Sequence, residues 1–596
     1  MVCAVAAIAT GAVLAALRYW MCDDAFITFR YADNLVRGHG LVFNAGERVE
    51  GYTNLLWTLW TALGLRIGVS ADAWAGFWGI ACFAATLALL ARRGWTIART
   101  ADVAWPLPAA AALAAIHHEW TVFATSGLET AAFAFLAVLG YVLVAPAEAR
   151  SPAATPPGSD EPPSAAAPRS GSRPGLGEVA HEAVEEVVRG RSVEPVRRGP
   201  GEQRRAIRLA AAGAVFALAS LTRPDGVLLA AVCGVWLLAG RDVRGAIGFA
   251  AGFAVLWLPA TIWRVAYYGD LFPNTYYAKS ASIAWWSQGW YYARIYFARY
   301  WVLALALPCA AFVRPRRAVA LELALAAVYT LYVMRVGGDF MFGRLLIPAS
   351  PFLLIIVERG LVALLGRRPL VRAAALAVLG GAMLAMPAAV DRHQRPRGIA
   401  DERDAYMVVL AGWAERADTN GATLAALFDG LPITVCFFGA QARLVYHSRV
   451  ATAIECETGL TDATIAHQPL GARGRIGHEK HAQLGYLLAR RVDFVLTRDY
   501  ANEVLHLDDQ LPDVPIELGR VRGRVISWDP AIMAALAARG VRVPDVPGQI
   551  DRYTAAMAGA PDDVVRRDWQ RFRRLYFDRV PDPVREAAFR VRLGQP

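Results

Sequence analysis

The sequence predicts a polytopic α-helical membrane protein with a water-exposed C-terminal part. Of its 596 residues, 56% are hydrophobic and only 19% are charged, whereas globular proteins average about 25% charged residues. Apolar residues gather in stretches close to the roughly 17 to 25 residues that cross a bilayer. Beyond residue 390 the chain is more polar, and apolar runs at 433–438 and 492–497 alternate with helical patterns. We therefore expect a soluble α/β domain over residues 391–596.

About eleven apolar segments are predicted to span the membrane. They lie at 2–20, 73–91, 103–118, 122–145, 206–221, 226–240, 245–266, 290–313, 318–336, 344–366 and 371–390. Residues 1–145 form the first part of the transmembrane domain, with an outer loop at 21–72, and residues 206–390 form its second part. The segment 51–67 is predicted to be an interfacial or re-entrant helix, because a span there would place Arg92 and Arg93 outside.

Arginine clusters between the spans predict the orientation of the chain. With the N-terminus inside, every loop assigned to the cytoplasm carries arginines, as the positive-inside rule requires. These loops are 92–93, 146–205, 241–244, 314–317 and 367–372. The net charge of +11 is therefore typical of membrane orientation and not of nucleic-acid binding. The C-terminal domain is assigned to the exterior.

The cytoplasmic insert at 146–205 is rich in Ala, Pro, Ser and Gly and then in mixed charges. Such a segment cannot bury enough apolar surface to offset the conformational entropy of the chain. We predict that it is a disordered linker without a role in chemistry.

Distinctive polar motifs are concentrated in the loops assigned to the outer face. They lie at 23–53, 117–129, 222–226, 267–279 and 337–344. Ionisable groups at a membrane are costly and tend to mark function. Carboxylates can deprotonate an acceptor hydroxyl, and cations can hold a phosphate. The mixture predicts sugar transfer from a lipid-phosphate donor.

These motifs resemble the polytopic GT-C glycosyltransferases related to the mycobacterial enzyme family that adds terminal β-1,2-arabinofuranose. The matching segments are Asp23–Trp57, Ala124–Glu129, Arg223-Pro224, Tyr267–Lys279, Gly337–Arg344 and Arg475–Lys480. The resemblance implies a GT-C-like fold, a polyprenyl-phosphate sugar donor and an inverting single displacement. It also implies an envelope glycan acceptor at the outer face of the cytoplasmic membrane. Arabinofuranose is the first candidate sugar.

The resemblance places the catalytic base in the first outer loop, at Asp23 or Asp24. Adjacent carboxylates point in different directions along a helix, so one of the two is expected to face the sugar. We prefer Asp24, because Asp23 has an alternative role as a helix cap.

Basic residues are predicted to bind the donor phosphate: Arg344, Lys279 and Arg223, with His478 and Lys480 from a C-terminal loop. A guanidinium can grip a phosphate through two hydrogen bonds. Snorkelling to the membrane interface is the alternative for Arg344, and an ion pair with Asp225 is the alternative for Arg223. The predicted sugar and acceptor contacts are Glu50, Tyr52, Glu129, Asn274 and Asp339.

No obligatory metal or other cofactor is predicted. The sequence His117-His118-Glu119 lacks the i, i+4 histidine spacing of a zinc helix. A single donor phosphate can be neutralised by Arg and Lys, although a divalent ion on the aspartate pair stays open.

Two further questions are left open by the sequence. Cys436 and Cys456 are the two cysteines of the polar C-terminal part, and they form a disulfide or remain free thiols depending on the compartment. A flippase or transporter of lipid-linked glycans is the alternative function. Transporters usually contain internal repeats, and we detect none here.

Overall fold

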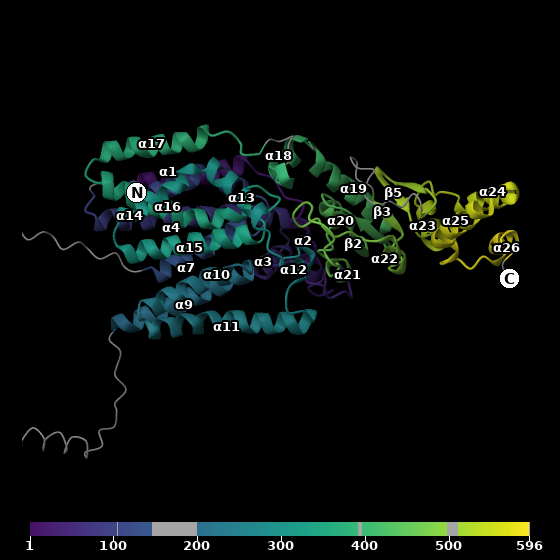
Figure 1. The fold of residues 1–596 in the computed structure, drawn as a ribbon, viewed down its shortest axis with the longest axis horizontal. Coiled ribbons are helices and arrows are strands. Elements are labelled where there is room, and N and C mark those ends of the chain that lie inside the picture. The colour runs from purple at the N-terminus through teal and green to yellow at the C-terminus, as the bar shows by residue number, and fades with distance from the viewer. Residues whose placement is uncertain (104, 146–199, 391–395, 410, 497–509, 595–596) are drawn as a thin grey trace, which may run out of the picture.

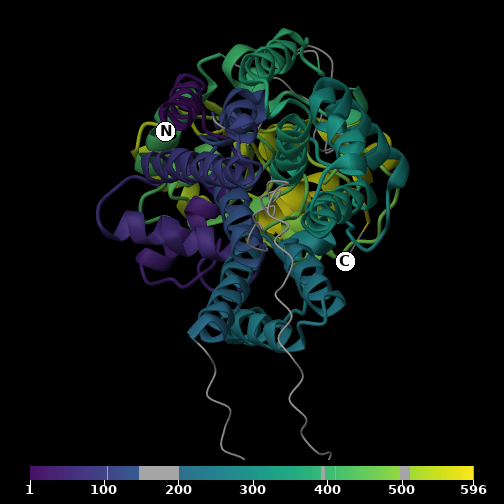
Figure 2. The same ribbon diagram turned by 90° about the vertical axis from the view of Figure 1, so that its left-hand side faces the viewer.

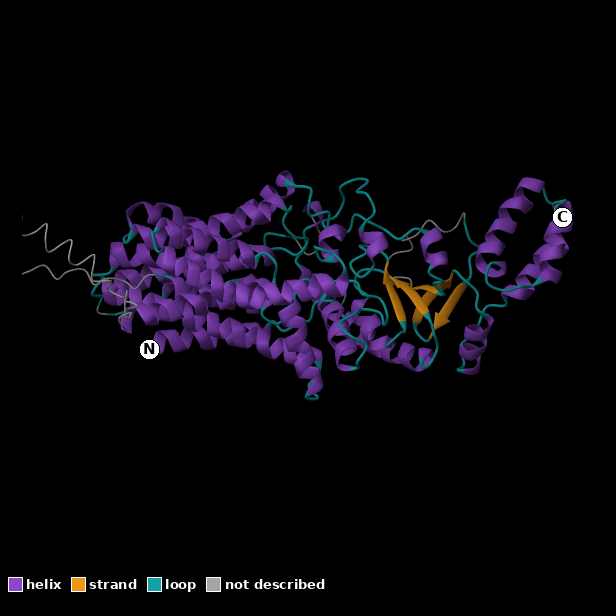
Figure 3. Ribbon diagram, turned by 90° about the horizontal axis from the view of Figure 1, so that it is seen from below, coloured by secondary structure: helices purple, strands orange, loops and turns teal. Residues whose placement is uncertain are grey.

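The computed structural model describes residues 1–103, 105–145, 200–390, 396–409, 411–496 and 510–594. A helical bundle makes up one end of the molecule, and a sheet flanked by further helices makes up the other (Figure 1). Figure 3 shows the strands between the bundle and the last helices. The N-terminus lies in the bundle, and the C-terminus lies beyond the sheet.

The bundle is built from apolar helices of very different lengths. Their bounds are α1 Val2–Leu17, α2 Ala25–Val36, α3 Leu55–Arg66, α4 Ala71–Thr100, α5 Ala109–Ile116, α6 His118–Phe123, α7 Thr130–Val144, α9 Pro200–Thr222, α10 Gly226–Ala239, α11 Val243–Tyr268, α12 Asn274–Ala278, α13 Trp286–Arg299, η1 Trp301–Leu305, α14 Ala306–Phe312, α15 Arg316–Arg335, η2 Arg344–Ala349, α16 Ser350–Leu365 and α17 Pro369–Ala385. Viewed end-on, α9, α10 and α11 form an arm at the lower edge of the bundle (Figure 2).

Five helices are long and apolar enough to cross a membrane. They are Ala71–Thr100, Gly201–Thr222, Val243–Tyr268, Arg316–Arg335 and Arg344–Leu365, and a pair bent by 91°, Trp286–Arg299 with Trp301–Phe312, would make a sixth. Length and composition thus define a multi-pass membrane protein. Four other predicted spans correspond to shorter apolar helices, Val2–Leu17, Thr130–Val144, Gly226–Ala239 and Pro369–Ala385. The total of eleven stays a prediction.

The segments 103–118 and 51–67 form short helices. Within the first, α5 has 8 residues and ends at the extended residue His117, where α6 begins. At 1.5 Å per residue α5 is far shorter than a bilayer core. The predicted span at 103–118 is therefore shortened to a helix at 109–116, and the end of that helix at His117 agrees with the predicted loop at 117–129. The second contains α3, a helix of 12 residues. Its predicted interfacial position stays a prediction.

The predicted linker lies mainly outside the described residues, which resume at Pro200. Residues 200–205 belong to α9, so the predicted boundary at residue 205 is wrong by one and a half turns. Proline is favoured at the first position of a helix, and Glu, Gln and Arg are strong helix formers. Arg205 also pairs with Asp242 at 2.6 Å. The helix therefore begins before the apolar periodicity does.

The C-terminal part contains a five-stranded mixed sheet in the order β2-β1-β3-β5-β4. The strands are β1 Thr434–Phe437, β2 Thr452–Glu455, β3 Phe494–Leu496, β4 Pro515–Leu518 and β5 Val521–Val525. β1 runs parallel to β2 and β3, and β5 runs antiparallel to β3 and β4. β1 and β3 lie within the apolar runs noted in the sequence. Buried on both sides, these strands read as continuous apolar segments.

Helices surround this sheet and extend beyond it. Their bounds are α18 Glu402–Asp404, α19 Trp413–Phe428, α20 Ala442–Ser448, α21 Ala463–Ala466, α22 Leu484–Ala489, α23 Pro530–Ala538, α24 Val546–Ala556, α25 Asp562–Phe572 and α26 Pro583–Arg592. Short irregular helical turns lie at 396–398, 405–409, 557–559 and 573–577. Of this set, α20 matters most for the site, because it follows β1 and faces α2.

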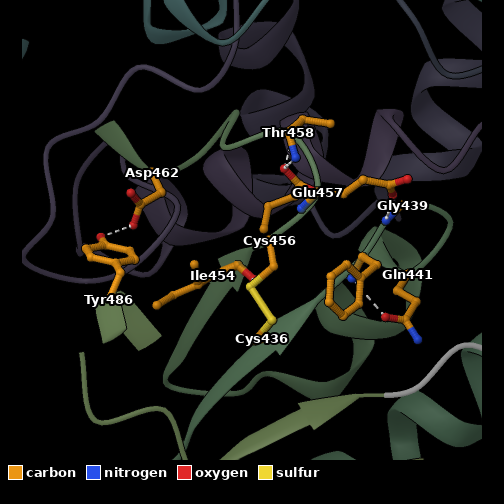
Figure 4. Close-up of a disulfide and its surroundings, with 11 residues drawn as sticks. Cys436, Gly439, Gln441, Ile454, Cys456, Glu457, Thr458, Asp462 and Tyr486 are labelled. Carbon is orange, nitrogen blue, oxygen red and sulfur yellow. Dashed lines mark hydrogen bonds between the residues drawn. A yellow bond between two sulfur atoms is a disulfide. The ribbon is translucent and has the colours of Figure 1, made fainter. Parts of the chain in front are cut away.

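A disulfide joins the two cysteines of the C-terminal part. Cys436 lies in β1, and Cys456 directly follows β2 (Figure 4). The remaining cysteines, Cys3, Cys22, Cys82, Cys233 and Cys309, are free. The structure therefore resolves the open question of whether Cys436 and Cys456 pair.

The disulfide predicts the thiol count of the native protein. Of seven cysteines, five should react with a maleimide reagent in the denatured protein before reduction and all seven after reduction. Mass spectrometry of labelled protein from native membranes measures the count. A Cys436→Ala, Cys456→Ala variant should give five in both conditions. Seven reactive thiols before reduction would contradict the disulfide.

Candidate active site

A cavity of about 470 Å³ lies where the bundle meets the C-terminal part. Its walls come from the predicted outer loops, and Leu460 and Ile476 of the C-terminal part close it. The polar lining includes Asp24, Tyr52, Asn54, Glu129, Arg223, Asp225, Lys279, Asp339 and Arg344. Seven of the twelve residues proposed from the sequence thus come together, from loops more than 300 residues apart.

Asp24 faces this cavity from the start of α2. Among the described residues its carboxylate has no hydrogen-bond partner, although Lys279, Arg344 and Arg475 are close enough to act on it electrostatically. Burial raises the pKa of Asp24, and the charges of Lys279 and Arg344 oppose that rise. The side chain is thus an available proton acceptor.

Asp23 points the other way and is occupied. Its two carboxylate oxygens accept hydrogen bonds from the backbone N–H groups of Ala442 and Arg443, both at 2.9 Å. These groups form the first turn of α20, whose N–H groups lack partners within the helix. Burial raises the pKa of Asp23 to about 7, against these two bonds. Asp23 therefore acts as a helix cap, which was the alternative role considered for it. The helix that it caps is α20 of the C-terminal part.

Two of the predicted phosphate ligands keep free donors. Arg344 donates from Nε to Asp339 at 2.7 Å, and its terminal nitrogens have no partner within the described chain. Lys279 forms no ion pair or hydrogen bond there either, and burial lowers its pKa. Lysine has three donors and arginine five. An anion entering the cavity would meet at least five unused N–H groups from these two residues.

Arg223 is committed to carboxylates. It donates from Nη2 to Asp225 at 2.9 Å and from Nη1 to Glu129 at 3.4 Å. Tyr329 also donates to Asp225, at 2.5 Å. The ion-pair alternative for Arg223 is therefore what the structure contains. Two carboxylates offset its charge, so Arg223 suits the positioning of Glu129 better than the binding of a phosphate.

Glu129 is held at the cavity wall by neighbours that the sequence did not single out. Asn54 donates from Nδ2 to Glu129 at 3.1 Å and to Thr28 at 3.1 Å. Tyr52, also in the wall, shares a hydrogen bond of 3.0 Å with Tyr268. Asn54 directly follows a predicted motif, but its partners are not visible from sequence spacing.

One side of the cavity is apolar. Val227 and Leu228 at the start of α10 face Tyr332 and Val336 at the end of α15, with Phe272 nearby. Both α10 and α15 are apolar helices of the membrane bundle. The cavity thus joins a charged region to an apolar wall formed by two helices of the bundle.

Besides Asp23, four predicted residues lie outside the cavity lining and have other contacts. Glu50 forms an ion pair of 2.7 Å with Arg264. Asn274 donates to the carbonyls of Gly459 and Leu460 at 2.9 and 2.8 Å. Both side chains therefore fix segments beside the cavity, and their sugar contacts stay a prediction. Such long-range partners were not accessible to reasoning from spacing.

His478 and Lys480 are the other two predicted residues that lie outside the cavity lining. Lys480 donates from Nζ to the carbonyl of Tyr277 at 2.7 Å, and so anchors the C-terminal loop to the bundle. His478 packs edge-on against Phe340, a cavity residue, with ring centroids 5.1 Å apart. Burial and the charge of Arg475 lower the pKa of His478 to about 4, so its imidazole is neutral near pH 7, and its role as a phosphate ligand stays a prediction.

Arg475 lies beside the cavity, although it is not part of the lining. Its guanidinium lies 4.6 Å from the ring centroid of Phe340, and its buried Nε has no hydrogen-bond partner among described residues. Gly477 of the same loop lies over Lys279. The motif at 475–480 thus indicated a loop that the structure places next to the cavity.

The described residues do not form a site for a metal ion. Among them, no group of three or more His, Cys, Asp and Glu side chains is arranged to hold an ion. His117 instead shares a hydrogen bond of 3.0 Å with Tyr296. Metal independence stays a prediction.

The fold and the cavity define a class of protein: a multi-pass membrane protein with a charged cavity at one end of its apolar helices. No family model matches the chain. The chain is similar to two curated terminal β-(1→2)-arabinofuranosyltransferases. The enzyme of Corynebacterium glutamicum is 29% identical over 382 residues, covering 58% of this chain and 49% of that protein. The enzyme of Mycobacterium tuberculosis is 27% identical over 386 residues, covering 58% and 53%.

These similarities confirm the resemblance indicated by the motifs, and the chain spans about half the length of the curated relatives it matches. Among solved structures, ArnT from Cupriavidus metallidurans bound to undecaprenyl phosphate aligns with a TM-score of 0.46 at 13% identity, over 78% of this chain and 87% of that chain. An Archaeoglobus fulgidus oligosaccharyltransferase aligns with a TM-score of 0.44 at 10% identity, over 86% and 72%.

The different surroundings of the aspartates predict opposite effects on stability. Asp23→Ala removes two buried hydrogen bonds and should lower the free energy of unfolding by about 1–3 kcal/mol. Asp24→Ala removes a desolvated carboxyl without such bonds and should leave stability unchanged or raise it. Thermal unfolding in detergent measures both variants, each serving as the other's control. Equal destabilisation would contradict the distinction.

Proposed function

We propose that this protein is a GT-C-type membrane glycosyltransferase. It transfers a sugar, arabinofuranose or a close relative, from a polyprenyl-phosphate donor to an envelope glycan, with inversion. The observation that carries the proposal is the arrangement in one cavity of an unpartnered carboxylate, Asp24, beside two cations with free donors, Lys279 and Arg344. Similarity to arabinofuranosyltransferases supports the choice of sugar.

The donor fits the division of the cavity into charged and apolar sides. A polyprenyl-phosphate sugar carries one phosphate, which Lys279 and Arg344 bind through charge-assisted hydrogen bonds. Its apolar tail lies toward Val227 and Tyr332, at the side where the cavity meets the apolar helices. One phosphate needs no metal to neutralise it, so no obligatory metal or other cofactor is proposed.

The reaction is a single displacement. The acceptor hydroxyl oxygen attacks the anomeric carbon, the bond from that carbon to the phosphate oxygen breaks, and its electron pair stays on the phosphate. Asp24 accepts the hydroxyl proton. The polyprenyl phosphate that leaves has gained negative charge, which Lys279 and Arg344 stabilise more strongly than they do the donor. Attack opposite to the leaving group inverts the anomeric centre.

The orientation follows from arginines and the disulfide. The arginines near 241 and 317 lie together, since Trp236 donates to the carbonyl of Arg317, at the ends of α10 and α15 remote from the cavity. By the positive-inside rule this supports a cavity that faces outward. The disulfide of the C-terminal part supports an oxidising exterior. We therefore propose a cytoplasmic-membrane protein whose partners are the lipid-linked donor, membrane lipids and an envelope glycan, and not nucleic acid.

Replacing the proposed base should stop transfer without stopping donor binding. Asp24→Asn keeps the shape of the side chain but removes the proton acceptor, so kcat should fall by about 10²–10⁴-fold. The assay uses protein in lipid nanodiscs, radiolabelled polyprenyl-phosphate arabinofuranose or mannose, and an envelope glycan extract. The exposed Asp563→Asn variant is the matched control.

The pH profile gives a second readout for Asp24. Since burial raises its pKa and the ionised form is the active one, wild-type transfer should increase as pH rises through that pKa and be lost below it. Residual transfer by Asp24→Asn should lack this limb. Unchanged transfer by Asp24→Asn would remove the assignment of the base. Movement of lipid-linked sugar across the bilayer without transfer would favour a flippase.

Loss of a phosphate ligand should act on the donor. Lys279→Gln should raise the KM for the donor about tenfold or more and also lower kcat, since the charge on the phosphate increases during the reaction. Lys279→Arg should recover part of the loss because the positive charge returns. The exposed Arg566→Gln variant is the control. An unchanged donor KM in Lys279→Gln would place the phosphate elsewhere.

A further inference from the structure

A second cavity lies on the opposite face of α2. It has a volume of about 380 Å³ and is bounded by α2, the start of α4, α19 and α20. Phe26, Asp33 and Arg37 line it at spacings of seven and four residues, which place them on one side of a helix. At 100° per residue this side is turned by roughly 180° from Asp24 and Thr28, which line the first cavity. One helix therefore separates the two cavities.

The second cavity offers donors, acceptors and an aromatic ring. Tyr446 from α20 is half-buried, with its ring centroid 5.5 Å from that of Phe26. Asp72, at the start of α4, has no ion pair or hydrogen bond within the described residues, and the same holds for the exposed Arg449. Burial and the charges of Asp33 and Asp72 raise the pKa of Tyr446, so its hydroxyl stays protonated and able to donate.

The balance of charge distinguishes this cavity from the first. Asp33 and Arg37 neutralise each other at 2.6 Å, and His447, also in the lining, contacts Asp418 at 3.0 Å. Among the described residues this leaves one acid, Asp72, and one base, Arg449, without an ion-pair partner. A phosphate would need an excess of cations, as Lys279 and Arg344 provide in the first cavity. A neutral polyhydroxyl ligand needs donors and acceptors in equal measure, together with an aromatic surface for its apolar face.

We infer that the second cavity binds a saccharide unit of the acceptor glycan away from the unit that receives the sugar. This inference rests on the proposed transferase function. The cavity volume is within the range of about 300–1,000 Å³ typical of small-molecule sites. Since α2 is about 10 Å across with its side chains, only an acceptor of several sugar units reaches both cavities. The site would thus select long acceptors over short ones.

The test compares acceptor length in the full chain in nanodiscs. The variant is Asp72→Asn, Arg449→Ala, which removes one carboxylate and one guanidinium at partly or fully exposed positions and leaves the net charge unchanged. The matched control is Asp563→Asn, Arg566→Ala, on the exposed side of α25. Arabinofuranose di- and hexasaccharides are the probes, with binding measured by saturation-transfer NMR and transfer by radiolabel.

We expect the variant to bind the hexasaccharide about tenfold more weakly and to raise its KM by a similar factor. Its kcat, and the KM of the disaccharide, should stay unchanged. Equal effects on both acceptors, or no effect on the hexasaccharide, would overturn the inference while leaving the transferase intact. Co-purified lipid lost from the variant, without hexasaccharide binding to the wild type, would instead identify a lipid head-group site and also overturn it.

Failure of the proposed function has a different signature. If the wild type transfers no sugar to either acceptor but its hexasaccharide binding is still weakened in the variant, the transferase proposal fails and the saccharide site stands. If the wild type transfers sugar and the variant binds the hexasaccharide as tightly as the wild type does, the transferase proposal stands and the saccharide site fails. Tyr446→Phe adds a third readout, because it keeps the ring and removes only the hydroxyl, and should weaken hexasaccharide binding less than Asp72→Asn, Arg449→Ala.

Discussion

Buried polar bonds between α2 and the C-terminal part are the constraint on which the site depends. Asp23 accepts from the first N–H groups of α20, and Arg30 donates to the carbonyls of Val445 and Val450 at 3.3 and 2.8 Å. Buried charges are tolerated when hydrogen bonds satisfy them. These bonds fix the rotation of α2 about its axis. Because Asp24 is the next residue, fixing Asp23 also directs Asp24 into the cavity.

The cavity contains two kinds of basic side chain: one is neutralised by carboxylates, and the other is available to bind an anion. Arg223 is enclosed by carboxylates, whereas Arg344 has one carboxylate partner and Lys279 has none among the described residues. The chain has 62 basic residues, and only Lys279 and Lys480 among them are lysines. Arginine serves orientation and ion pairing elsewhere. A compact ammonium on a flexible stem suits the proposed binding and release of a phosphate.

The alternation of apolar and polar segments predicted those residues of the candidate site whose positions depend on the local sequence. Asp24, Lys279 and Arg344 stand at helix ends in polar outer loops, which the alternation of apolar and polar segments reveals. The partners that occupy the other candidates are far away in sequence: Asp23 bonds to residue 442, Glu50 to Arg264 and Asn274 to residue 459. Only the folded chain brings them together. The start of α5 was missed for a different reason, because apolar composition alone does not register that Pro106 and Pro108 delay the helix to Ala109.

The far end of the bundle explains why the loop that carries Arg344 is rigid. Glu322 of α15 accepts from Arg359 of α16 at 2.9 Å and from Tyr141, and this buried pairing fixes the two helices at the end remote from the cavity. Their other ends are joined by residues 336–349, which form a turn at 336–343 and then η2. In this turn Gly338 and Gly343 have φ of 78° and 75°. A Cβ at these glycines would meet Tyr292 and Glu119 at 2.5 and 2.6 Å. The turn is therefore confined on both sides, and the Asp339–Arg344 ion pair that it carries is held at the cavity wall before any ligand arrives, as preorganised phosphate binding requires.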